Sequence, residues 1–161
     1  MPIQKLKEFL DNENIKYVAI SHSRAYTAQG IAALTHISGK ELAKTVIVKI
    51  DETLAMAVLP ASQHVDLVLL KAATGAKTVA LAGEAEFKDR FPDCETGAMP
   101  PFGNLYGMTV FAEESLTKDR EIAFNSGTHS ELIRLSWHDF VRLVNPRILK
   151  FSSERARPRA A

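Results

Sequence analysis

Apolar residues recur every three to four positions in several stretches of the chain, the spacing that brings them onto one face of a helix. In residues 3–11, Ile3, Leu6 and Leu10 are separated by polar and charged side chains, which predicts an amphipathic opening helix. Ser136 is a suitable N-cap for the last helix, with Asp139 three residues on as in a capping box. We expect helices in residues 3–11, 27–34, 65–73, 84–91 and 136–144.

Other stretches are rich in β-branched and aromatic residues, which favour strands. Residues 45–50 are the clearest case, and the turn residues Asp51 and Glu52 predict that residues 54–59 pair back with them as a hairpin. We expect strands in residues 15–20, 45–50, 54–59, 78–81, 106–112, 122–125 and 131–135. Because helices and hairpins mix without a regular β-α-β alternation, the pattern predicts an α+β fold with a largely antiparallel or mixed sheet.

The length and charge of the chain limit what it can be. With 161 residues and no internal repeat or linker, we expect one compact domain over residues 1–151 and a disordered, arginine-bearing tail over residues 152–161. The net charge of +1 predicts no global attraction to nucleic acid or membrane. No apolar run has the length of a transmembrane helix, and the N-terminus lacks a signal-peptide segment. We therefore expect a cytoplasmic protein with no membrane partner.

Several kinds of catalytic site lack the residues that they need. Cys94, the one cysteine, lies between two acidic residues that disfavour its thiolate, which makes it a poor nucleophile. The chain has no serine nucleophile elbow, phosphate-binding loop or dinucleotide fingerprint. None of the histidines stands in a recognisable zinc pattern: they are His22, His36, His64, His129 and His138. We therefore expect neither a metal nor a cofactor.

Three short stretches remain as candidates for one pocket. Lys44 stands at the mouth of an apolar strand, where a partly buried ammonium needs an anionic or carbonyl partner. Residues 97–103 hold two glycines and two prolines without a charge, and residues 126–130 place His129 beside a glycine turn. Taken singly, each has a structural explanation: a solvated lysine, a rigid turn and a structural histidine. Their combination favours a binding or catalytic site.

The three stretches together resemble the YbaK and prolyl-tRNA synthetase editing-domain family. The matching segments are residues 42–46 (LAKTV), 97–103 (GAMPPFG) and 127–132 (GTHSEL), in the family's order and rough spacing. The resemblance covers about residues 3–144. It implies a compact α+β domain with a mixed, partly closed sheet flanked by helices. It also implies a free-standing aminoacyl-tRNA deacylase, which hydrolyses the ester joining a wrong amino acid to tRNA.

The resemblance also implies roles for individual residues. It makes Lys44, Gly97 and His129 the catalytic residues. Glu113 stands where family members often have aspartate, and this departure leaves its role open. The implied partners are the acceptor end of aminoacyl-tRNA and, as a further candidate, an aminoacyl-tRNA synthetase. The implied substrate-binding positions are Thr45, Pro101, Phe102, Gly103, Gly127 and Thr128.

An aminoacyl ester is already activated, so a deacylase has to hold it, admit a water and stabilise an oxyanion. We expect the backbone N–H of Gly97 or Gly127 to serve the oxyanion, Lys44 to hold the carbonyl or a terminal phosphate, and His129 to bind the amino acid or orient the water. A rigid wall formed by Pro101 and Phe102 would limit the substrate to Ala, Ser or Cys. Two alternatives stay open: a binding module for an amino acid, nucleotide or acceptor end, and a hydrolase of another small acyl ester or amide.

Overall fold

The computed structural model describes residues 3–22 and 41–154, so the helix expected in residues 27–34 lies outside the described residues. Four α-helices are described: α1 (Gln4–Asn12), α3 (Leu67–Thr74), α4 (Glu84–Phe87) and α5 (Trp137–Val144). Short 3-10 helices are η1 (Lys88–Arg90), η2 (Gly103–Leu105) and η3 (Glu114–Lys118). The described helices include none that is long and apolar enough to span a bilayer.

The helix ends follow the capping residues. Ser136 Oγ accepts a hydrogen bond from the backbone N–H of Asp139 at 3.0 Å, which confirms the predicted start of α5. Helix α3 begins two residues later than expected because the Asp66 carboxylate accepts from the first N–H groups of the helix and caps it there. It ends at Gly75, which adopts φ 70° in the left-handed region.

A five-stranded sheet in the order β5-β2-β3-β6-β9 forms the centre of the molecule. The predicted hairpin is present, with every residue of β2 (Ala43–Ile50) paired to β3 (Thr53–Pro60). Strand β6 (Val110–Glu113) lies parallel to β3 and to β9 (Arg147–Leu149), and β5 (Val79–Leu81) completes the far edge. Strand β6 is shorter than the pattern predicts because Gly107 turns the chain at φ 68°.

A second sheet of three strands packs against the first. Its order is β1-β8-β7, formed by β1 (Tyr17–Ser21), β7 (Glu121–Asn125) and β8 (Glu131–Ser136). In the described part of the chain, one parallel bridge between Leu42 and Ala123 joins the two sheets. The sheets therefore meet without closing into a continuous barrel. The prediction of an α+β fold with a mixed sheet is confirmed.

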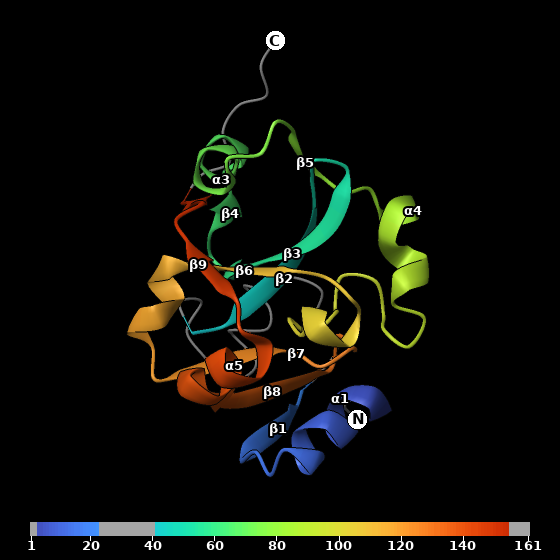
Figure 1. The fold of residues 1–161 in the computed structure, drawn as a ribbon. Helices are drawn as coiled ribbons and strands as arrows, with labels where there is room; N and C mark the ends of the chain where they lie inside the picture. Colours follow the sequence, from blue (N-terminus) through green and yellow to red (C-terminus); the bar gives the residue numbers. More distant parts are fainter. Residues whose placement is uncertain (1–2, 23–40, 155–161) are drawn as a thin grey trace.

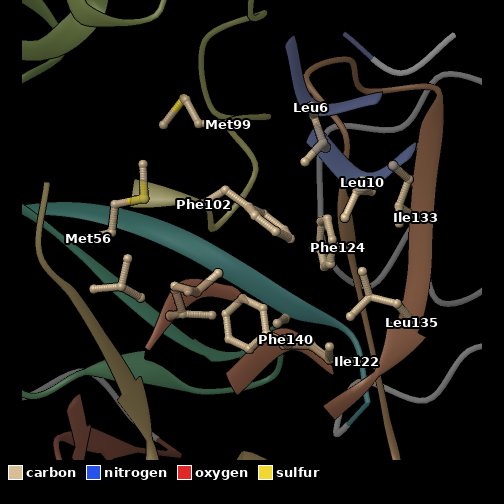
Figure 2. Packing of buried hydrophobic residues seen from close by; sticks show 14 of the residues in the cluster. Leu6, Leu10, Met56, Met99, Phe102, Ile122, Phe124, Ile133, Leu135 and Phe140 are labelled. Carbon is tan, nitrogen blue, oxygen red and sulfur yellow. The ribbon is translucent and has the colours of Figure 1, made fainter. Parts of the chain in front are cut away.

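The main core fills the space between the two sheets and the helices α1 and α5 (Figure 1). Phe102 lies at its centre, with ring centroids 5.4 Å from Phe124 and 5.7 Å from Phe140. Figure 2 shows its ring directed into this cluster, toward Phe124. A second cluster, which includes Leu70 and Phe111, packs α3 against the other face of the five-stranded sheet. The central sheet is thus covered on both faces.

The start of the polar tail differs from the sequence prediction. Ser152 and Ser153 form strand β10, which pairs with β4 (His64–Val65), so these two residues are not disordered. Phe151 is fully buried, and its backbone N–H donates to Glu113 Oε2 at 2.7 Å, as does that of Ser152 at 2.8 Å. A buried carboxylate therefore holds the C-terminal segment against the end of β6. Residues 155–161 lie outside the described residues.

Candidate active site

The glycine loop and the β7–β8 hairpin tip lie together, as the sequence analysis expects. The backbone N–H of Glu95 donates to the Gly127 carbonyl at 2.7 Å, and the N–H of Gly127 donates to the Ala98 carbonyl at 2.9 Å. These two backbone hydrogen bonds join segments that are about thirty residues apart in the chain, much as the hydrogen bonds of a short β-ladder would. They fix the position of His129 relative to Gly97.

His129 is buried and lies against the loop. Its Nε2 is 2.8 Å from the carbonyl oxygen of Thr96, and its backbone N–H donates to Glu95 Oε2 at 3.3 Å. A carbonyl only accepts hydrogen bonds, so Nε2 must carry a proton in this contact. Nε2 is therefore not a base in this arrangement. The geometry supports a role for His129 in holding the loop, which is the structural explanation that the sequence also allows.

The glycines of the loop and of the hairpin tip have different structural reasons. Gly97 adopts φ 87°, and a Cβ there would lie 3.5 Å from Cε1 of His129, which is ordinary contact. Gly127 adopts φ 106°, and a Cβ there would come within 2.3 Å of Ile3 Cγ2. A Cβ on Gly103 would meet the Met108 carbonyl at 2.4 Å. Packing thus explains Gly127 and Gly103, whereas at Gly97 the positive φ, rather than a steric clash, is what favours glycine.

Two expected oxyanion donors are already engaged. The N–H of Gly127 is bound to the Ala98 carbonyl, and the N–H of Gly97 is 3.2 Å from Met99 Sδ. The expectation that Gly127 supplies the oxyanion donor is therefore wrong for this arrangement, and Gly97 would first have to release a sulfur acceptor, which is weak. Next to Gly127 in the hairpin tip, the backbone N–H of Thr128 makes no hydrogen bond within the described part of the chain. Its side chain lies 3.4 Å from the Ser130 hydroxyl.

The wall residues are placed differently from the prediction. Phe102 has no exposed surface, and Pro101 is also buried. The Phe102 side chain supports the loop from inside the core, because its apolar ring gains more from packing there than from lining a wet pocket. The argument that a Pro-Phe wall selects small substrates is therefore wrong.

Lys44 is half-buried near the start of β2. Its ammonium makes no hydrogen bond or ion pair within the described residues, and burial lowers its pKa from the usual lysine value. The Leu42–Ala123 bridge sets this end of β2 beside β7, the strand that leads into the hairpin tip. Successive residues of a strand point to opposite faces, so the side chains of Lys44 and Thr45 lie on opposite faces of β2 and do not line one site together.

Other polar groups complete the description. Burial, together with the nearby charge of Asp93, raises the pKa of the Cys94 thiol to about 11, which agrees with the expectation that it is no nucleophile. Glu95 was missed by the sequence analysis, although its backbone and carboxylate both contact the hairpin tip. The one sequence feature that could have indicated these contacts is the position of Glu95 two residues before Gly97. Within residues 3–22 and 41–154, no three His, Cys, Asp or Glu side chains are grouped as metal ligands.

Comparisons with known proteins agree on one family. The model of the aminoacyl-tRNA editing domain matches residues 22–143, which include Lys44, the glycine loop and the hairpin tip. The multifunctional Ser/Thr-tRNA deacylase ProXp-y of Escherichia coli (strain K12) is 26% identical over 153 residues, 92% of this chain and 91% of that protein. The same protein of Escherichia coli O157:H7 is equally similar.

Two solved structures share the fold. A hypothetical protein superposes with a TM-score of 0.83 at 19% identity, over 93% of this chain and all of that one. A proposed trans-editing enzyme for prolyl tRNA synthetase superposes with a TM-score of 0.80 at 16% identity, over 94% of this chain and 96% of that one. The α+β architecture thus recurs at low sequence identity.

Proposed function

Because the chain belongs to the aminoacyl-tRNA editing domain family, we propose that it hydrolyses the ester of mischarged aminoacyl-tRNA in trans. Its substrates carry a small amino acid, with serine and threonine foremost, since the similar ProXp-y is a Ser/Thr-tRNA deacylase. The observation that carries the proposal is the half-buried ammonium of Lys44, which has no counter-charge within the described residues. Removing an ammonium from water costs free energy when no acceptor or counter-charge replaces its hydration, and a bound ligand can supply that partner.

The ester carbonyl supplies such a partner. When water attacks the carbonyl carbon, the carbonyl oxygen gains negative charge, and a cation fixed nearby stabilises that charge more than it stabilises the ground state. The C–O bond to the terminal ribose then breaks, and the ribose oxygen takes up a proton. The N–H of Thr128 offers a second donor at the hairpin tip. We assign His129 to positioning the loop, because its Nε2–H is held by the Thr96 carbonyl.

The tRNA is engaged through its acceptor end. A net charge of +1 provides few phosphate contacts, which are the main source of affinity for nucleic acid. Recognition confined to the terminal aminoacyl-adenosine needs few such contacts. We therefore expect the protein to bind tRNA weakly by itself, with an aminoacyl-tRNA synthetase as a candidate for delivering the substrate.

A deacylation assay tests the proposal directly. The purified protein is incubated with Ser-, Thr-, Ala- and Cys-tRNA, each prepared on a non-cognate tRNA, and loss of the ester is followed against a no-enzyme control. We expect multiple turnovers on at least one of them. Saturable binding without turnover would identify a binding module instead. Hydrolysis of simple acyl esters, with all aminoacyl-tRNAs left intact, would identify a general esterase.

Lys44→Met separates catalysis from stability. We expect its deacylation rate to fall at least about a hundredfold, as when a group that stabilises an oxyanion is removed. Its thermal stability at neutral pH should equal or exceed that of the wild type, because the lowered pKa of Lys44 means that burying its charged form opposes folding. That penalty is fully present below the folded-state pKa and is relieved as the pH rises through it. The stability difference should therefore narrow at alkaline pH. Full activity of this variant would overturn the role of Lys44.

A further inference from the structure

Strands β2 and β7 present two polar side chains on one shared face. Leu42 and Ala123 form the parallel bridge between the strands and pack in the same small cluster, together with Ala61 and Leu132. Residues two apart on a strand share a face. The next position on that face is Lys44 in β2 and Asn125 in β7.

The alternation of buried residues supports this placement. In β7, Ile122 and Phe124 belong to the main core, whereas Ala123 packs in the small cluster on the opposite face. In β2, Ala43 and Ile47 belong to the main core. The side chains of Lys44 and Asn125 are therefore both excluded from the main core. Among the described residues this one bridge joins the two strands, and the pairing does not continue to Lys44 and Asn125.

The side chain of Asn125 carries an acceptor atom without a donor. Its Oδ1 is buried and accepts no hydrogen bond from any residue in the ranges 3–22 and 41–154. A buried amide oxygen without a donor costs roughly as much free energy as a lost hydrogen bond, and such atoms in native proteins call for an explanation. A ligand that brings a donor to this face is one explanation. Lys44 cannot be served by the same ligand atom, because its ammonium requires an acceptor.

We propose that Asn125 is a specificity-determining residue whose Oδ1 accepts a hydrogen bond from the α-ammonium group of the aminoacyl ester. This inference rests on the proposed deacylase function. The ester has an acceptor, its carbonyl oxygen, and a donor, its α-ammonium, separated by two carbon atoms. Lys44 and Asn125 offer the complementary pair on one face. Together they distinguish an aminoacyl ester from an acyl ester that lacks the amino group.

The neutrality of the amide is part of this assignment. A carboxylate at this position would attract the α-ammonium more strongly, but its charge would also attract the ammonium of Lys44 on the same face. The Lys44 ammonium would then be less available to the substrate. An amide accepts a hydrogen bond and leaves the charge of Lys44 available to the carbonyl oxygen.

The experiment compares two esters on the same tRNA: the seryl ester and the 3-hydroxypropionyl ester, which is serine without its amino group. Wild type, Asn125→Ala and Asn125→Ser are assayed on both, and thermal unfolding is recorded for each protein. For the seryl ester we expect kcat/KM of Asn125→Ala to fall roughly tenfold to a hundredfold, the loss typical of one hydrogen bond to a charged group. For the 3-hydroxypropionyl ester we expect its kcat/KM to stay within about twofold of wild type.

The outcomes separate the two hypotheses. If wild type hydrolyses neither seryl-tRNA nor any other aminoacyl-tRNA, the proposed function fails and this inference falls with it. If wild type is active but Asn125→Ala loses the same factor on both esters, or loses nothing on the seryl ester, this inference alone is wrong. If both variants fail to fold, Asn125 is a structural residue and the inference is equally overturned. A selective loss on the seryl ester supports it.

Discussion

Removal of the Glu113 carboxylate should destabilise the protein without impairing its active site. Glu113 is 4% exposed, and its Oε2 accepts two backbone hydrogen bonds, from Phe151 at 2.7 Å and from Ser152 at 2.8 Å. In Glu113→Ala both N–H groups lose their acceptor. At about 1–3 kcal/mol for each unsatisfied group, partly relieved by water, we expect a loss of about 2–5 kcal/mol. For a chain of this length that corresponds to a fall in Tm on the order of 10 °C.

A matched pair of variants sharpens the test. In Glu113→Gln one amide oxygen can still accept both hydrogen bonds, but their charge assistance is lost, so a smaller cost of about 1 kcal/mol is expected. Glu114→Gln, which makes the same charge change on the exposed neighbouring side chain, should alter stability by less than about 0.5 kcal/mol.

Thermal unfolding, hydrogen exchange at Phe151 and Ser152, and deacylation per folded molecule are the measurements. We expect faster exchange at these two amides and unchanged deacylation in both Glu113 variants. If Glu113→Ala keeps its Tm but loses deacylation, Glu113 belongs to the active site and its structural assignment here is wrong.

The remaining predictions concern the glycine loop, the hairpin tip and the cysteine. His129→Ala should lower stability by about 1–2 kcal/mol through loss of its hydrogen bond to the loop, and should raise KM more than it lowers kcat; a collapse of kcat at unchanged KM and Tm would make it a catalytic residue instead. Gly127→Ala should destabilise by at least about 2 kcal/mol, since its Cβ would strike Ile3 at positive φ, whereas Gly97→Ala, with ordinary contact distances but a φ of 87°, should unfold at a Tm closer to wild type; equal losses in unfolding experiments would contradict this ranking. Cys94→Ser should remain active, and alkylation of Cys94 at pH 8 should be slow because burial raises its pKa to about 11; rapid alkylation that abolishes deacylation would refute it.

Local order in this protein was predictable from consecutive residues. The hairpin of residues 45–59 follows from a β-branched run, two turn residues and a second apolar run. The start of α5 follows from Ser136 and the end of α3 from Gly75. Such signals are short in sequence, because a capping hydrogen bond or a turn spans only a few residues. The family resemblance also depended on short segments, and the family match confirms it.

Side-chain environments were decided by the tertiary structure. In the sequence, Phe102 stands in a segment that we expected to form a pocket wall. In the structure its ring packs against Phe124 of β7 and Phe140 of α5. Residues 152–153 are polar, and the sequence predicts that they are disordered. The buried Glu113 carboxylate, however, accepts hydrogen bonds from the backbone N–H groups of Phe151 and Ser152 and so holds this segment in place. In both cases the deciding partner is more than twenty residues away, and no local pattern identifies it.

The same limit applies to the candidate site. Sequence alone identified Lys44, Gly97 and His129 as residues worth testing, because unusual residue types stood in recognisable segments. It could not show that Nε2 of His129 is held by the Thr96 carbonyl, or that Asn125 follows the bridge on the same face as Lys44. Those facts depend on how β7 lies beside β2 and how the loop crosses the hairpin tip. Both arrangements depend on contacts between segments that are far apart in the sequence. The free energy of a buried polar contact depends on which other groups the complete fold buries around it, and a local sequence pattern does not contain that information.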